Sequence, residues 1–367
     1  MRRYTWVVAL VMCFSLVLAG CGVGKKDAAG VVKDLDGVMN KLQSYHGTGT
    51  MVLHTGQDPQ EYAVEVCYEA PHFYRISLTN EKKDITQIVL RNDDGVFVLT
   101  PHLNKSFRFQ SDWPENQGQV YLYQSLAQSI LMDNERQMTA DEKAYVFDVV
   151  ANYQNGSLAR QKVWLDKKTY APQHVEVADA NGNVMVMMKF NEFEFGAKFD
   201  KDQFDMQRNM TSMSIQSLPT MANAGSDKHN HGATATGNKS ANNGAAAAKT
   251  DVAKQQEFGI IEPNYMPSGV KLQDKTMIKL GEDQGVMLRY SGKFNYTLVE
   301  SRPTTQTVTS LQGNVIDLGF TLGVVTGDSK KTLTWTYDGV EFRLSTGDLP
   351  ETEMIKVAQA VQGEMGK

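Results

Sequence analysis

Cys21 is the residue with the clearest chemistry in this sequence. It directly follows Leu18, Ala19 and Gly20, and small residues before a cysteine are typical of sites where a diacylglyceryl group is attached to the thiol and the preceding segment is then cut off. A positively charged start and an apolar stretch at residues 6–19 precede it, which is the pattern of a secretory signal peptide and is short for a membrane span. We therefore predict a signal peptide at 1–20 and a lipidated tether at 21–25. The alternative is an ordinary cleaved signal, or an uncleaved anchor, in which Cys21 has no role.

Lipidation at Cys21 would decide where the protein works. Each buried CH2 of an acyl chain contributes about 0.8 kcal/mol, so two or three chains hold a protein firmly on a bilayer. We expect the chain to be lipid-anchored at the cell membrane, on the extracytoplasmic face, with the membrane as its first partner.

Groups that could act together in catalysis are not evident in the sequence. It contains no nucleophile elbow, phosphate-binding loop, zinc-protease helix or calcium-binding loop. His229 and His231 could both contact one metal ion, but no cysteine or cluster of carboxylates stands near them. We therefore predict a protein that is not an enzyme and that has no catalytic residues, no cofactor and no metal site.

Cys67 would be the one thiol left in the mature chain, because Cys13 leaves with the signal peptide and Cys21 is acylated. An intramolecular disulfide is then impossible, and stability outside the cell must come from packing. Alternation places Cys67 on the strand face that carries Glu61 and Glu65, and neighbouring carboxylates raise the pKa of a thiol. An inert thiol is favoured over a redox-active one.

The composition indicates a folded protein of two domains. The chain has 367 residues, of which 41% are hydrophobic, and a formal net charge of -5. This hydrophobic content excludes global disorder, and the mild acidity offers no surface for nucleic acid. From residue 209 to 256 the sequence is rich in Gly, Ala, Ser, Asn and Thr, which predicts a disordered linker. It separates an N-terminal domain at 26–208 from a C-terminal domain at 257–367.

Two helices and several antiparallel strands are expected in the N-terminal domain. Asp27 is a candidate helix cap, and an apolar stripe of helical spacing follows it at Val31, Leu35, Val38, Leu42 and Tyr45. A second helix is expected at 117–132. Runs of period two, separated by turns such as Asn92-Asp93-Asp94-Gly95, predict strands. The pattern indicates an α+β fold in which one curved antiparallel sheet is covered by helices.

The apolar face of this sheet is the candidate site of the domain. Its residues recur at period two along the predicted strands: Tyr62, Val66, Tyr68, Tyr74, Ile76, Phe107, Phe109, Phe147 and Val177. They either line a cavity for a lipid or an acyl chain, or form a packed core with the helices. Periodicity does not separate the two interpretations.

The cysteine motif, the opening amphipathic helix and the strand pattern of residues 21–208 resemble a known family. The most characteristic stretch runs from Ile88 to Pro114. The chain is similar to LolA/RseB-fold lipoproteins of spore-forming Firmicutes, often described as outer-membrane lipoprotein-sorting proteins, a broad group that includes the germination lipoprotein GerS. The resemblance implies a LolA-like, unclosed antiparallel β-barrel covered by helices, whose hollow accommodates acyl chains in the better understood relatives. In a host with a single membrane, sorting to an outer membrane is excluded.

The C-terminal domain is expected to be a small α+β unit. Strands alternate at 286–290, 294–299 and 332–344, and Pro350 precedes a terminal helix with Met354, Ile355, Ala358 and Val361 on its apolar side. The order of Trp335, Asp338-Gly339 and Leu344 before this helix resembles an uncharacterised domain found at the ends of Firmicute envelope proteins.

Taken together, the sequence predicts a non-enzymatic lipoprotein that binds a hydrophobic group, either a lipid or a lipoprotein acyl chain, in its half-barrel. A second domain on a flexible linker would extend its reach. The alternative is an interaction scaffold or sensor in sporulation, germination or envelope stress, which binds an envelope protein and has no ligand cavity.

Overall fold

The computed structural model describes residues 26–54, 58–110, 113–114, 119–153, 158–216, 259–303 and 310–362. The predicted signal peptide, the tether with Cys21, and His229 with His231 all lie outside these residues. In the part that is described, no helix is long and apolar enough to cross a membrane.

A curved sheet of twelve strands forms the larger part of the protein, in the order β15-β6-β5-β4-β3-β2-β1-β11-β10-β9-β8-β7. The strands from the N-terminal region are β1 (Ser44–Leu53), β2 (Gln60–Glu69), β3 (Phe73–Asn80), β4 (Ile85–Asn92), β5 (Gly95–Thr100), β6 (Lys105–Gln110), β7 (Gln137–Ala140), β8 (Ala144–Val150), β9 (Leu158–Asp166), β10 (Pro172–Asp179) and β11 (Val184–Phe195). A short helix η1 (Pro101–Leu103) lies between β5 and β6.

The sheet is antiparallel between these strands and is not closed, which confirms the predicted α+β half-barrel. Its first and last long strands, β1 and β11, pair at the middle, while β6 and β7 lie toward opposite edges. The predicted alternation holds in β2, where Tyr62, Val64, Val66 and Tyr68 are all buried on the concave side.

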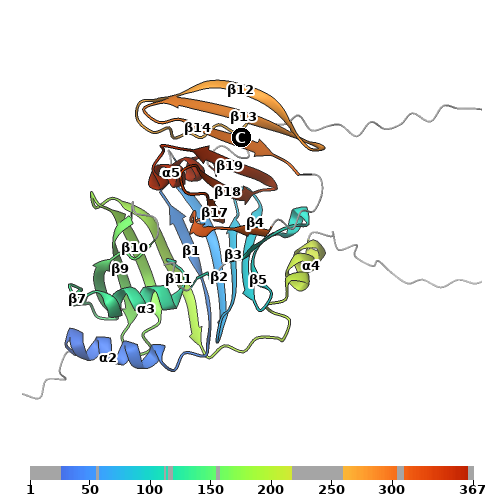
Figure 1. Ribbon diagram of the computed structural model, residues 1–367. Helices are drawn as coiled ribbons and strands as arrows, with labels where there is room; N and C mark the ends of the chain where they lie inside the picture. Colours follow the sequence, from blue (N-terminus) through green and yellow to red (C-terminus); the bar gives the residue numbers. More distant parts are fainter. Residues whose placement is uncertain are drawn as a thin grey trace, which may run out of the picture.

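Helices α2 (Ala28–Met39) and α3 (Tyr123–Met132) lie together at one end of the half-barrel (Figure 1). The predicted cap is confirmed, since the Asp27 carboxylate accepts a hydrogen bond from Gly30 N at 2.9 Å. The first helix is shorter than its apolar stripe suggested, because Tyr45 belongs to β1. The second begins at Tyr123 rather than at 117, and Leu122 and Tyr121 before it are buried without being helical.

A third helix, α4 (Met206–Gln216), covers part of the convex side of the sheet. The prediction of a linker from residue 209 onward is wrong at its start, because residues 209–216 belong to this helix. Asn209 and Met210 are 3% and 8% exposed, because they pack against the sheet where a linker residue would lie in water. This cover also explains β4, in which Ile88 and Leu90 face the convex cluster while Val89 faces the concave core.

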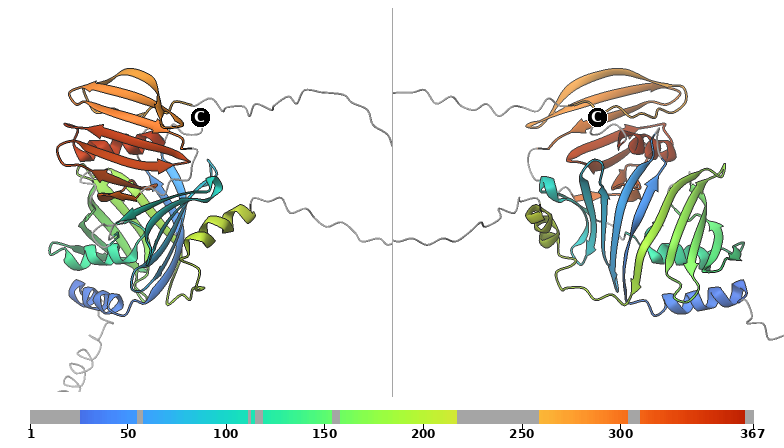
Figure 2. Two further views of the ribbon diagram at one scale, coloured as in Figure 1. Left: turned by 45° about the vertical axis from the view of Figure 1, so that its right-hand side comes forward. Right: turned by 180° about the vertical axis from the view of Figure 1, so that it is seen from behind.

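A second sheet of seven strands lies above the opposite end of the half-barrel (Figures 1 and 2). Its order is β12-β13-β14-β19-β18-β17-β16, with β12 (Val270–Leu280), β13 (Asp283–Gly292), β14 (Tyr296–Ser301), β16 (Asn314–Asp317), β17 (Leu322–Thr326), β18 (Lys331–Tyr337) and β19 (Val340–Thr346). Helix α5 (Glu351–Gln362) follows, and its predicted apolar residues, among them Met354 and Ala358, are buried. The C-terminal region is therefore the expected second α+β unit.

The two sheets share one hydrophobic core, which the expectation of a second domain extending on a flexible linker did not foresee. Buried residues of both sheets, such as Val66 and Phe342, belong to a single cluster. Strand β15 (Ser310–Gln312) also leaves the C-terminal region and pairs in parallel with β6 at the edge of the half-barrel. The C-terminal sheet is thus docked on the half-barrel.

Candidate functional site

The nine residues predicted to line a ligand site do lie on one face, the concave face of the half-barrel. They come from β2, β3, β6, β8 and β10 and belong to one core cluster. None is more than 7% exposed. The sequence therefore identified the concave face correctly, while their role in binding a ligand stays a prediction.

Aromatic side chains of the protein itself occupy this face. The ring centroids of Tyr45 and Tyr68 are 5.2 Å apart, those of Tyr68 and Tyr74 are 4.8 Å apart, and Phe193 stacks on Tyr45 at 5.1 Å. Helix α3 is bound to the same group, because Tyr45 Oη donates to Gln124 Oε1 at 2.9 Å and Gln124 Nε2 donates to Tyr74 Oη at 3.1 Å. Rings at these separations attract one another and leave the face packed.

The turn between β18 and β19 inserts into the mouth of the half-barrel. Gln87 Nε2 on β4 donates to the carbonyl of Thr336 at 3.1 Å, and Lys105 Nζ on β6 donates to the carbonyl of Gly339 at 2.9 Å. Gly339 has a φ of +71°, and a β-carbon there would overlap the side chain of Leu103. The Asp338-Gly339 turn noted in the sequence therefore packs closely against Leu103. We name residues 336–339 the hairpin finger.

A second loop of the C-terminal sheet enters beside it. In this loop, residues 317–321, Gly319 lies against Leu53 of β1, with only 3.1 Å between an added β-carbon and a Leu53 methyl. With its amide nitrogen turned toward them, Gln119 donates to Asp317 Oδ2 at 2.5 Å and to Tyr121 Oη at 2.8 Å. Gly319 N donates to Asp317 Oδ1 at 2.7 Å. We name residues 317–321 the acidic finger.

Asp317 is the one ionisable group of the acidic finger, and it is partly buried. Burial raises the pKa of this carboxyl to about 7, although the hydrogen bond from Gly319 N opposes the shift. Burial disfavours the charged form of an acid unless a cation or several donors compensate. Sequence reasoning missed this residue, since no periodicity marks a polar group that is buried only after two distant segments meet.

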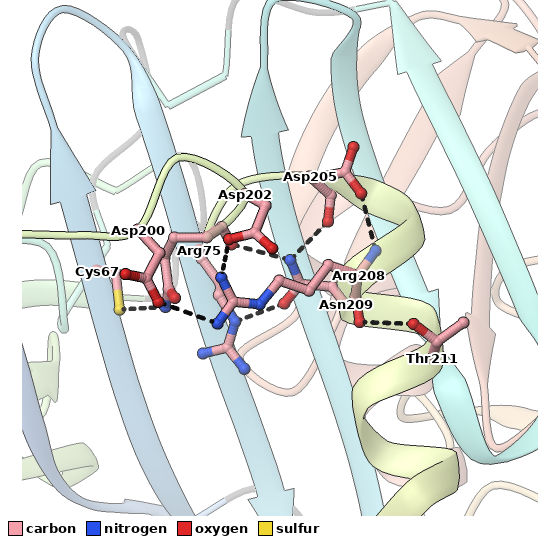
Figure 3. A network of polar contacts seen from close by, with 9 residues as sticks. Cys67, Arg75, Asp200, Asp202, Asp205, Arg208, Asn209 and Thr211 are labelled. Atoms are coloured by element: carbon pink, nitrogen blue, oxygen red, sulfur yellow. Dashed lines mark hydrogen bonds and ion pairs between the residues drawn. The ribbon is translucent and has the colours of Figure 1, made fainter.

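A polar network on the convex side surrounds Cys67 (Figure 3). Gln203 Nε2 donates to Cys67 Sγ at 3.5 Å, and Arg75 Nε donates to Asn209 Oδ1 at 2.6 Å. Arg75 Nη1 donates to Glu65 Oε2 at 2.6 Å. The network fastens residues 199–210 over the convex apolar cluster, which includes Phe204 and Met210.

Ligand types suitable for zinc come together here, because His46 on β1 pairs directly opposite Cys67 on β2. Ligand atoms of His46, Glu65 and Cys67 lie within 4.8 Å of one another. The Arg75 guanidinium, however, already neutralises Glu65. A divalent cation about 4 Å from a guanidinium would meet a repulsion of about 8 kcal/mol at an effective dielectric constant of 20. The group is therefore better explained as an ion-pair network, and the absence of a metal site stays a prediction.

A family model and a relative of known name both relate this chain to the same group of sporulation proteins. Residues 1–204 match the family model described as "Sporulation protein YdcC-like". The chain is 37% identical over 356 residues to "Sporulation protein YdcC" of Bacillus subtilis (strain 168), which covers 96% of this chain and 95% of that protein.

Several solved structures are similar at low TM-scores. The structure of Pseudomonas aeruginosa MucA/MucB matches with a TM-score of 0.29 and 14% identity, over 89% of this chain and 98% of that one. A putative outer membrane lipoprotein-sorting protein domain from Vibrio parahaemolyticus gives 0.30 and 14%, over 49% and 98%. The CwlD amidase from Clostridioides difficile in complex with the GerS lipoprotein gives 0.29 and 15%, over 47% and 97%. At these values the likeness carries no argument about function.

Phe147→Ala distinguishes a packed concave face from an open ligand cavity. Phe147 is fully buried, so we expect the free energy of unfolding to fall by about 3–5 kcal/mol, as for other truncations of a packed aromatic ring. Urea unfolding measures this, with Met132→Ala, at a 70% exposed position, as a control expected to change stability by less than about 0.5 kcal/mol. A loss below about 1 kcal/mol for Phe147→Ala would show that the ring borders empty space.

The thiol of Cys67 should react slowly. Burial, and then the negative charge of Glu65, raise its pKa to about 11, so little thiolate is present at pH 8. In a Cys21→Ser form without the signal peptide, we expect alkylation of Cys67 at pH 8 to be at least ~100-fold slower than in the same protein unfolded in urea, where the thiol has its ordinary pKa of about 8.5. Equal rates in the two states would contradict the buried environment.

Proposed function

The chain belongs to the YdcC-like family of sporulation proteins, and from this premise we propose that it is an extracytoplasmic lipoprotein, anchored through Cys21, that acts in sporulation by binding an envelope protein. The membership agrees with the resemblance to lipoproteins of spore-forming bacteria that the sequence carries. Attachment of acyl chains at Cys21 and the absence of enzymatic activity are parts of the proposal.

The single observation that supports protein binding over lipid carriage is the filled and covered concave face. Its nine predicted residues are at most 7% exposed, and the hairpin and acidic fingers enter the mouth of the half-barrel. A carrier needs a cavity of several hundred Å³ that buries most of its ligand. With the face filled by its own rings, the outer surfaces of the two sheets are the parts open to a partner.

Carriage of a lipid or a lipoprotein acyl chain is the second candidate, and the chemistry of the same face favours it. Its residues, aliphatic ones such as Val66, Ile76 and Val177 together with aromatic rings, belong to one hydrophobic cluster. Such a lining would accept an acyl chain once its cover was removed, because burial of apolar surface is favourable wherever it occurs.

Mass spectrometry of the protein purified from membranes decides between the two candidates. Protein binding predicts a mature chain that begins at Cys21, carries covalent acyl chains and retains no further lipid in stoichiometric amount. One non-covalent lipid per protein, retained by the Cys21→Ser form as well, would instead establish the carrier.

Sporulation tests the anchor in the cell. We expect loss of the gene to lower the yield of heat-resistant spores, and we expect the wild-type gene, but not Cys21→Ser, to restore it, because the unanchored protein leaves the membrane surface. The amount and solubility of the Cys21→Ser protein serve as the control. Full restoration by a Cys21→Ser protein that still fractionates with membranes would contradict the proposed anchor.

A further inference from the structure

The docked C-terminal sheet is also the feature that controls access to the concave face. We propose that this sheet is a detachable cover of the half-barrel, whose grip is weakened when Asp317 in the acidic finger loses its proton. The inference concerns the contact between the two sheets and holds whichever partner the protein binds.

The cover meets the half-barrel through polar contacts that are incompletely matched. The amide nitrogen of Gln87 donates to the hairpin finger, but no partner lies within hydrogen-bond reach of its Oε1, although this atom is buried. The same holds for the buried hydroxyl of Thr321 in the acidic finger. A buried polar atom without a partner is unfavourable, so the docked state is less stable than its apolar contacts alone would make it.

At the rim of the half-barrel, the polar contacts contribute little to the stability of the docked state. His102 Nε2 of η1 lies 3.2 Å from Asp338 Oδ1 of the hairpin finger, with both side chains more than one third exposed. Exposed polar contacts of this sort add little to stability. The apolar contacts between the two sheets, whose buried residues belong to one hydrophobic cluster, therefore supply most of the attraction.

Asp317 is the weak point because, among the residues that the structure describes, the groups facing it carry no positive charge. The segment before α3 presents the amide of Gln119 and the neutral phenol of Tyr121. The segment after β8 presents the neutral phenol of Tyr153. Helix α5 presents Gln359, whose Nε2 donates to the carbonyl of Leu318 at 3.2 Å. Within the described residues, the Gly319 N–H and the Gln119 amide are the two groups that donate to the carboxyl.

A negative charge at this place is stabilised by two donors but by no cation, whereas an undocked Asp317 is solvated by water. Docking raises the pKa of this carboxyl from 3.8 to about 7. A raised pKa means that docking is strongest below pH 3.8, weakens as pH rises, and reaches its lower limit just above pH 7. Between pH 5.5 and 8.0 this shift corresponds to a roughly 30-fold fall in the docking equilibrium constant.

Hydrogen exchange of the full-length lipoprotein in detergent, followed by mass spectrometry at pH 5.5 and 8.0 and corrected for intrinsic rates, measures the docking. We expect peptides from both sides of the contact, the end of β1, β4 near Gln87 and the two fingers, to open roughly 30-fold more often at pH 8.0. Peptides within the C-terminal sheet, such as β18 before the finger, should stay protected, because the sheet detaches without unfolding.

Asp317→Asn should abolish the pH dependence at the contact and leave it closed at both values, since the amide keeps the shape without the charge. Asp328→Asn removes an exposed carboxylate of the same sheet and should behave like the wild type. Glu300→Gln removes a second buried carboxyl, whose pKa burial raises to about 8, and it should change exchange inside the C-terminal sheet but not at the contact.

Gly319→Leu provides a test that does not involve titration. Gly319 has a φ of +86° and touches Leu53, so a larger side chain should force the contact open at both pH values while β18 remains protected. Equal exchange of the wild type at the two pH values would overturn the proposal. So would simultaneous loss of protection in β18 and at the contact, which would mean that the sheet unfolds rather than detaches.

Discussion

Pairing of β1 with β11 is the interaction on which the rest of the structure depends. It joins the first and last long strands of the N-terminal region along nine residue pairs, from Tyr45 with Phe195 to Leu53 with Val186. The pairing bends the sheet around a single concave face that is apolar along its whole length. An apolar face of this size has to be buried, because exposed apolar patches of more than a few hundred Å² are rare in stable monomers.

Segments from three distant parts of the chain bury this face. Helices α2 and α3 cover one end of the concave face, and the C-terminal sheet covers the other (Figure 2). The convex side needed its own cover, because β4 and β5 present Ile88, Leu90, Phe97 and Leu99 there. Residues 199–210 provide it and are fastened through Arg75 and Asn209. The positions of the covering helices, of residues 199–210 and of the second sheet thus follow from which surfaces of the twelve-stranded sheet are apolar.

Local patterns in the sequence predicted the elements whose two faces differ. Alternation in β2 and the cap at Asp27 both proved reliable, since each depends on neighbouring residues only. The apolar run of β4 gave no alternation, because both of its faces are buried. Most of helix α4, from residue 209 on, falls in the predicted linker, since its sequence is polar and its contacts come from the sheet.

The sequence predicted which residues share the concave face, but not whether that face is packed or lines a cavity. Periodicity places Tyr68 and Tyr74 on one side, yet it does not show that their rings and that of Tyr45 meet. The bond from Gln87 to Thr336 spans 249 positions, and the register that sets His46 opposite Cys67 is equally invisible to local patterns. Long-range polar contacts of this kind leave no periodic signal.

The separation between Gln87 and Thr336 also has a consequence for biogenesis. The half-barrel strands of the N-terminal region are complete at Phe195, whereas the two fingers that cover them are made only with β16 to β19. At 5–20 residues per second, synthesis of the intervening chain takes on the order of ten seconds. During this time the concave face has no C-terminal sheet to bury its mouth. An incomplete chain would then expose apolar surface to membranes and to other chains, and such surface makes a nascent chain prone to aggregation.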